Sequence, residues 1–182
     1  MGQNGKKTEH IVIDANIVLS SLLRHEGYTQ AVLSILLCSG DVKVIAPSGI
    51  IKEIERHLYE ISRRSKLPFN VVRNSLKLIL KCIKQVREEE FRDEILMSLP
   101  LVKHKEDAPL AGLAMKYSPS VVLTYNKKHF ESEKLEKHGV RVFTPRELIE
   151  YLNLELKTSS RLKRRGGFLK IMSSLLIRKK LD

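Results

Sequence analysis

Three acidic residues stand at positions where carboxylates can bind a metal ion: Asp14, Glu53 and Asp107. Asp14 ends the apolar run of IVIDAN, Glu53 lies near the start of a helical stretch in APSGIIKEI, and Asp107 opens the helix in KEDAPLAGLA. Carboxylate oxygens are preferred ligands of Mg²⁺ and Mn²⁺, and ions held in this way bind phosphodiesters. Strand ends and first helical turns can meet at one rim of a parallel sheet. The three acids therefore predict metal-assisted hydrolysis, in which the ion makes hydroxide available near neutral pH.

Each acid also has a purely structural explanation. Asp14 and Asp107 stand where aspartate caps a following helix. Glu53 has the spacing of a helical pair with His57 and is a neighbour of Arg56. Taken together with the order of strands and helices, the three positions favour the metal site over these separate explanations. Two adjacent acids rank behind them as candidate ligands: Glu55 and Glu106.

Polar residues follow the β-type run Val121–Thr124. Thr124 and Asn126 can hydrogen-bond a carboxylate, a metal-bound water or a phosphate oxygen, and would thereby orient the metal ligands. Lys127 and Lys128 can hold a substrate backbone, although a lysine pair on a loop is more often only solvated. Asn126 can equally well be an ordinary turn residue. The nearby His129 can equally well be an ordinary surface imidazole.

Short β-type runs alternate with helical stretches along the chain. We expect four strands, at 11–13, 42–46, 121–124 and 140–143, and helices at 17–23, 29–38, 50–61, 108–117 and 145–152. The last helix opens with a capping box, in which Thr144 and Glu147 flank Pro145. This order predicts an α/β domain with three layers: a mostly parallel, twisted sheet of four to five strands between helices. In such sheets ligands bind outside the carboxyl ends of the strands.

The middle of the chain is predicted to be helical. Apolar residues recur there at helical spacing: Val72, Leu76, Ile79, Ile83 and Val86. The charged stretch 87–94 is interpreted as a solvated face or the end of that helix. This region is longer than a minimal domain of the expected kind requires, and it can shape a substrate groove or a dimer surface.

Composition limits the class of protein. The chain has 182 residues, a formal net charge of +12 and 42% hydrophobic residues, so one folded domain with a polyanionic partner is expected and global disorder is excluded. Cys38 and Cys82 have no zinc or disulfide spacing and are predicted to be small buried hydrophobes. There is neither an apolar run of about 18 residues nor an apolar secretion signal near the start, which predicts a soluble, cytoplasmic protein.

A basic tail, 153–182, follows the predicted domain, 10–152. Its nine Lys and Arg residues face two acids, a net charge of +7. Arg164 and Arg165 precede a Gly-Gly hinge and an apolar helical stripe that runs from Phe168 to Leu176. The tail can bind RNA phosphates, lie on an anionic membrane, or pack its stripe on this domain or a second subunit. Membrane association is the least favoured of the three.

The ordered set of motifs resembles the PIN domain, a superfamily of metal-dependent ribonucleases that includes many prokaryotic toxins. The resemblance covers roughly His10 to Leu152, and it is carried by Asp14-Ala15-Asn16, by Glu53, by Asp107, and by the segment from Thr124 to Phe130. It implies a doubly wound sheet and an acidic pocket that binds one or two Mg²⁺ or Mn²⁺ ions. Asp14, Glu53 and Asp107 match the family's three recurrent metal-binding acids. Asn126 departs from the pattern, because many members carry an aspartate there, and a second ion is expected to bind more weakly.

The resulting prediction is a divalent-metal-dependent endoribonuclease in which Asp14, Glu53 and Asp107 bind the metal and the tail assists RNA binding. The resemblance also implies that homodimers are common and that an antitoxin protein is a possible partner. The competing hypothesis is a catalytically weak or inactive RNA-binding or scaffold protein, which the missing fourth acid and the basic tail favour.

Overall fold

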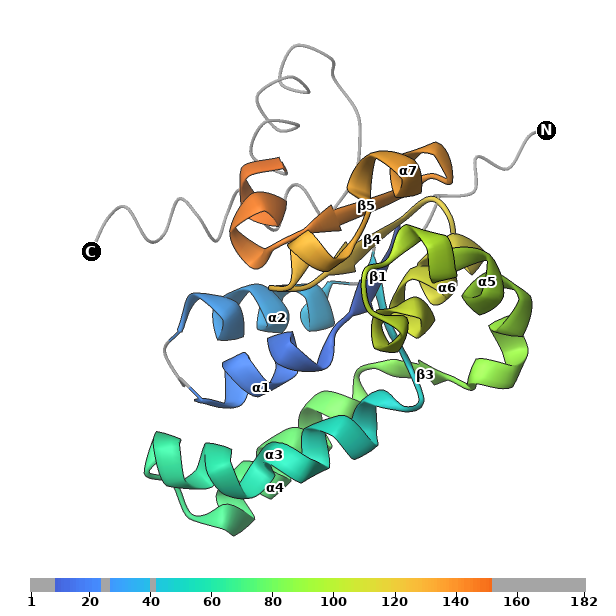
Figure 1. The fold of residues 1–182 in the computed structure, drawn as a ribbon. Helices are drawn as coiled ribbons and strands as arrows, with labels where there is room; N and C mark the ends of the chain where they lie inside the picture. Colours follow the sequence, from blue (N-terminus) through green and yellow to red (C-terminus); the bar gives the residue numbers. More distant parts are fainter. Residues whose placement is uncertain (1–8, 24–26, 40–41, 152–182) are drawn as a thin grey trace, which may run out of the picture.

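The computed structural model describes residues 9–23, 27–39 and 42–151. Five parallel strands form one sheet in the order β3-β2-β1-β4-β5 (Figure 1). The strands are β1 (Glu9–Ile13), β2 (Val42–Pro47), β3 (Lys84–Val86), β4 (Ser120–Leu123) and β5 (Val140–Phe143). The predicted α/β sheet of four to five strands is therefore confirmed, and it is parallel throughout the described residues.

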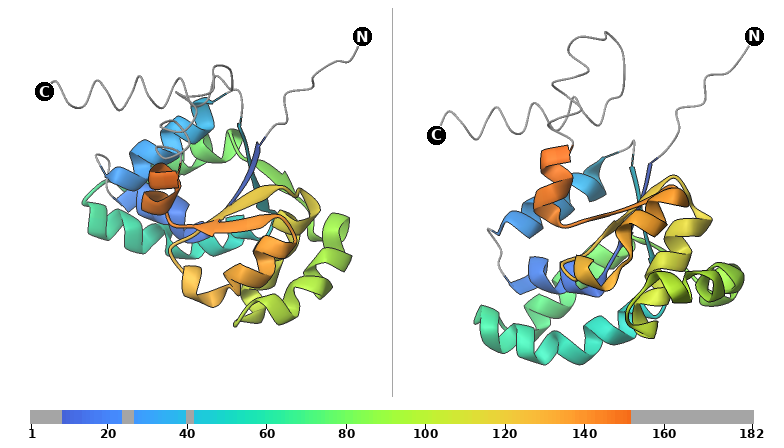
Figure 2. Two further views of the ribbon diagram at one scale, coloured as in Figure 1. Left: turned by 90° about the horizontal axis from the view of Figure 1, so that it is seen from above. Right: turned by 45° about the horizontal axis from the view of Figure 1, so that its top comes forward.

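Helices cover both faces of the sheet (Figures 1 and 2). The α-helices are α1 (Ala15–Leu23), α2 (Tyr28–Cys38), α3 (Ile50–Ser65), α4 (Phe69–Lys81), α5 (Arg92–Ser98), α6 (Ala108–Lys116), α7 (Ser132–Lys137) and a final helix at 145–151. Short 3-10 helices lie at η1 (Glu88–Phe91), η2 (Leu99–Leu101), η3 (Lys105–Asp107) and η4 (Lys127–His129). In the described parts of the chain, no helix is long and apolar enough to cross a membrane.

Alternating residues of the strands build two separate cores. Ile11 and Ile13 of β1 face the core under α1 to α4 and the final helix, whereas Val12 faces the core under α5, α6 and α7. Successive side chains of a strand point to opposite faces, so a strand covered on both sides is apolar at every position. This explains why IVI carries no polar residue before Asp14.

The predicted continuous middle helix is wrong. Helix α4 ends at Lys81, and Val86 belongs to β3, which pairs with the edge of β2 through the register Pro47↔Val86. Spacings of three residues suit a helix, but a short strand can satisfy the same pattern when a sheet edge offers backbone partners. The tertiary partner therefore decided the structure of this segment.

Three further predictions concern the two cysteines, the capping box and the basic tail. Both cysteines are exposed, at the last residue of α2 and directly after α4, so the prediction that Cys38 and Cys82 are buried is wrong. The capping box is present: Thr144 N donates to Glu147 Oε2 over 2.9 Å, and Glu147 N donates to Thr144 Oγ1 over 3.3 Å. The basic tail, 153–182, with Arg164 and Arg165, lies outside the described residues.

Candidate active site

Strands β1 and β4 lie side by side and bring two polar side chains to the carboxyl edge of the sheet. Their register pairs Ile13 with Leu123, so Asp14 and Thr124 are the next residue of each strand. Asp14 N donates to Leu123 O over 3.1 Å, which extends the ladder by one bond. The expected convergence of strand ends therefore holds for these two residues, although 110 positions separate them in the chain.

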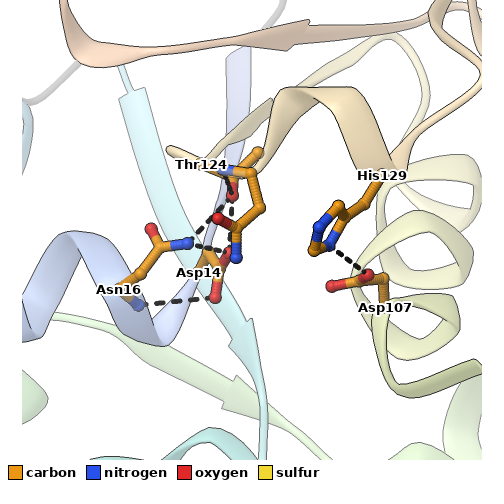
Figure 3. Close-up of polar contacts among 6 residues, drawn as sticks. Asp14, Asn16, Asp107, Thr124 and His129 are labelled. Carbon is orange, nitrogen blue, oxygen red and sulfur yellow. Dashed lines mark hydrogen bonds and ion pairs between the residues drawn. The ribbon is translucent and has the colours of Figure 1, made fainter. Parts of the chain in front are cut away.

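The carboxylate of Asp14 is buried and held by hydrogen bonds (Figure 3). Thr124 Oγ1 and Asn16 Nδ2 each donate to Asp14 Oδ2 over 2.6 Å. Asn16 N approaches Asp14 Oδ1 at 3.4 Å, a long contact. The residue has only 6% of its surface exposed. Since the two short bonds come from the neighbouring strand end and from a side chain of α1, the carboxylate does more than cap that helix.

Asn16 is the residue of this cluster that the sequence did not assign to the site. Its Nδ2 also donates to Thr124 Oγ1 over 3.1 Å, and its Oδ1 accepts from Tyr125 N over 3.2 Å. Asn126 uses its backbone N, 2.9 Å from Thr124 Oγ1, whereas the sequence suggested its side chain. An asparagine two residues after a strand-end aspartate was the available signal, because such a side chain can reach back to the carboxylate.

The environment of Asp14 disfavours its charge. Burial raises the pKa of Asp14, and the negative charge of Asp107 raises it further, while hydrogen bonds from Thr124 and Asn16 oppose this. A carboxylate that is fixed by donors yet short of positive charge is a site at which a cation would be stabilised.

Glu53 reaches the same region from the first turn of α3. Burial raises the pKa of Glu53, with a further contribution from the charge of Asp14, whereas His57 and Arg56 act in the opposite direction. Within the described part of the chain its carboxylate has no hydrogen bond or ion pair. The structural alternative, a pair with His57, is therefore not formed, and the carboxylate is available to a ligand.

Asp107 lies at the N-cap position of α6, but its side chain makes no capping hydrogen bond. Instead, Asp107 Oδ2 lies 3.1 Å from His129 Nδ1, as Figure 3 shows. The ring of His129 in turn packs edge-on against His104, with the ring centroids 4.4 Å apart. Since the charge of Asp107 raises the pKa of both Asp14 and Glu53, the third acid acts on the same centre.

A pocket of about 640 Å³ opens between β1, α3, η1 and the start of α6. Four acids line it: Asp14, Glu53, Glu88 and Glu106. Glu106 ranked behind Asp107 in the sequence, yet it lines the pocket and Asp107 does not. The pocket lining thus favours Glu106 as the third acid, whereas the electrostatic effects on Asp14 and Glu53 favour Asp107. The charge of Asp107 raises the pKa of both Asp14 and Glu53, and Glu106 is exposed, so Asp107 stays the stronger candidate for the third ligand.

Glu88 was not predicted from the sequence. It follows β3 in η1, and its Oε1 lies 2.7 Å from the point where a Cβ would stand on Gly49. A side chain at position 49 would therefore displace this carboxylate from the start of α3, where a negative charge is favourable. Glu88 lies two residues after the end of β3, a signal that was hidden because β3 was interpreted as helix.

The donor set fits a hard divalent cation. The pocket offers carboxylate oxygens, and Mg²⁺ commonly binds through one or two carboxylates while keeping several waters. Among the residues that the structure describes, no three His, Cys, Asp or Glu side chains already stand as a complete ligand set.

The two predicted substrate lysines differ. Lys127 Nζ lies 2.8 Å from Glu147 Oε1, so its charge is engaged by the capping box of the final helix. The hydrogen bond with Lys127 and those within the capping box hold the pKa of Glu147 below its ordinary value, although burial opposes them. Lys128 is exposed. Within the described residues, Lys127 forms an ion pair and Lys128 does not.

Comparison with known proteins supports the resemblance seen in the motifs. The profile described as PIN domain matches residues 12–153. Among solved structures, the chain is similar to PAE2754 from Pyrobaculum aerophilum, with a TM-score of 0.46 and 18% identity, covering 80% of this chain and 90% of that chain. No curated protein gives a significant match. Because the profile covers well over half of the sequence, this chain belongs to the PIN domain family, whose members are generally nucleases.

Proposed function

We propose that the protein is a divalent-metal-dependent endoribonuclease, with Asp14, Glu53 and Asp107 binding Mg²⁺ or Mn²⁺. The observation that carries this proposal is the state of Asp14: a buried carboxylate that accepts two 2.6 Å hydrogen bonds, while burial and a nearby acid raise its pKa. Keeping this carboxylate ionised and buried lowers the stability of the folded protein unless a bound cation compensates its negative charge. The family and the acidic pocket support the same function.

The residues of the chain divide the work. Asp14 and Glu53 supply carboxylate oxygens from a strand end and from a helix start, and Thr124 and Asn16 fix the orientation of Asp14. His129 holds Asp107 through Nδ1. A bound divalent ion would supply Lewis acidity and a water of lowered pKa, which is the chemistry that hydrolysis of a phosphodiester near neutral pH requires. Asn126 adds no charge where many relatives have an acid, which favours one tightly bound ion over two.

The experiment that tests the proposal is cleavage of a labelled, mixed-sequence RNA in Mn²⁺, Mg²⁺ or EDTA by wild-type and Asp14→Asn protein purified in parallel. We expect wild-type protein to cut only with metal and the variant to lose at least about a thousandfold in rate, because the fixed carboxylate is gone. Equal cleavage by both proteins would identify a contaminating nuclease and contradict the proposal.

A second candidate is an RNA-binding protein of the same fold with little or no cleavage. It is favoured by Asn126 at the position of a family acid and by the excess of positive charge in the basic tail. RNA binding that is equal in wild-type and Asp14→Asn protein, without metal-dependent cleavage in either, would support it. Homodimerisation and an antitoxin partner stay predictions, which size-exclusion chromatography and co-expression can test.

A further inference from the structure

One wall of the acidic pocket is basic. Lys52 and Arg56 stand one turn apart on α3 and line the pocket together with Glu53. Both side chains are exposed, and within the described residues neither forms an ion pair, although Glu55 lies three residues after Lys52. Like charges four residues apart destabilise a helix slightly, so the stability of α3 does not explain this pair, although the charge of Arg56 also acts on Glu53, where it opposes the rise in pKa.

An RNA strand would need both kinds of charge in this pocket. The acids repel phosphates unless a metal ion stands between them, so on their own they cannot hold the strand beside the bond that is cut. Cations on the same wall can bind the adjoining phosphates directly. With a volume of about 640 Å³, the pocket is far larger than a hydrated ion requires, and it leaves room for nucleotide groups next to the metal.

We propose that Lys52 and Arg56 form a phosphate clamp that holds the RNA backbone next to the scissile bond. This inference rests on the proposed function of the pocket. It makes the preferred substrate a longer RNA with phosphates beside the cut, rather than a minimal dinucleotide. It also differs from the sequence-based choice of Lys127, whose charge is paired with Glu147.

The test measures binding separately from cleavage. Full-length protein carrying Asp14→Asn is titrated in EDTA against a fluorescent single-stranded 12-nucleotide RNA over a range of NaCl concentrations. Adding Lys52→Gln and Arg56→Gln is expected to weaken binding about tenfold or more at low salt. It should also reduce the slope of log Kd against log salt by about 1.4, the value for two phosphate contacts with a single strand.

Helix α4 offers a matched control. Lys77 and Lys81 are also four residues apart and exposed, and they lie away from the pocket lining. Lys77→Gln with Lys81→Gln removes the same charge and should change Kd less than about threefold. Lys52→Arg with Arg56→Lys keeps the charge and should retain most of the affinity. Circular dichroism checks that each variant is folded.

The outcomes separate the clamp from the nuclease proposal. Unchanged RNA binding in the Lys52/Arg56 variant, or an equal loss in the Lys77/Lys81 control, would overturn the clamp even if wild-type protein cleaves RNA with metal. A selective loss of binding would support the clamp even if no metal produces cleavage, in which case only the nuclease proposal fails. In an active protein, the same two substitutions should raise KM for the 12-nucleotide RNA with little change in kcat.

Discussion

The two walls of the pocket are built differently. On the strand-end wall, Asp14 is buried and receives short hydrogen bonds from Thr124 and Asn16. On the α3 wall, Lys52, Glu53 and Arg56 are exposed and have no hydrogen bond or ion pair within the described chain. The first wall fixes one carboxylate in place, whereas the second presents charges that can adjust to a ligand.

This difference assigns separate tasks to the two walls. Reaction geometry depends on rigid positioning, which packed strands and mutual hydrogen bonds supply. Binding a flexible polyanion depends more on the number and accessibility of positive charges. We therefore expect substitutions in the strand-end wall to reduce the rate of cleavage, and substitutions of the basic residues on α3 to reduce affinity.

The largest effect, apart from the loss of Asp14 itself, is expected at the third acid. Asp107→Asn should reduce metal-dependent cleavage by more than about 100-fold, beyond what orienting partners of a metal ligand usually contribute. Glu106→Gln should reduce it less than about fivefold, because Glu106 is exposed and screened by solvent. Initial rates over a series of Mn²⁺ concentrations measure both variants. A larger loss in Glu106→Gln than in Asp107→Asn would mean that Glu106, which lines the pocket, is the third metal ligand.

A smaller effect is expected at Thr124. Thr124→Val keeps the shape of the side chain but removes the hydroxyl that donates to Asp14 Oδ2, and it should lower kcat by about 10- to 100-fold, with a weaker metal affinity. Thr124→Ser retains the hydroxyl and should retain most of the activity. If Thr124→Val instead raised only KM for RNA, the strand-end wall would be a substrate-binding surface, and the comparison would fail.

The smallest effect concerns stability in the absence of metal. A carboxyl with a raised folded-state pKa binds its proton more tightly in the folded than in the unfolded protein, so its contribution to stability falls as pH rises through that raised pKa. Asp14→Asn should therefore raise Tm at pH 7 by about 2–4 °C, the shift for about 1 kcal/mol in a chain of this size. The gain should vanish near pH 3. Glu53→Gln should give a smaller gain, since Glu53 is much less buried than Asp14.

Adding Mn²⁺ provides the control for that measurement. An ion that binds only the folded protein raises its Tm, so wild-type protein should gain more from Mn²⁺ than Asp14→Asn protein. Thermal unfolding by circular dichroism at pH 3, 5 and 7, with and without Mn²⁺, distinguishes these cases. A lower Tm for the metal-free variant at pH 7 would show that the hydrogen bonds to Asp14 outweigh the cost of its buried charge.

Much of the fold could be predicted because its signals are local. Strands covered on both faces have continuous apolar runs such as IVI. The start of the last helix is marked by the capping box of Thr144 and Glu147. The error at β3 arose because the deciding contact is distant in sequence. Val86 has the spacing of a helical stripe, but its segment pairs with the edge of β2 and forms a strand. The same error concealed Glu88, because a strand end was not expected there. The exposed Cys38 and Cys82 show that residue type alone does not determine burial.

The sequence by itself determined the alternation of strands and helices, the acids at their ends, and the excess of positive charge. Periodicity, capping and composition depend on neighbouring residues, so they can be read along the chain. Only the tertiary structure decided that Thr124 would hold Asp14 from 110 residues away, that Asn16 would link the two, and that Lys52 and Arg56 would face the acidic pocket. These contacts depend on the strand order and on the packing of α3 beside the sheet, which are set by the fold as a whole.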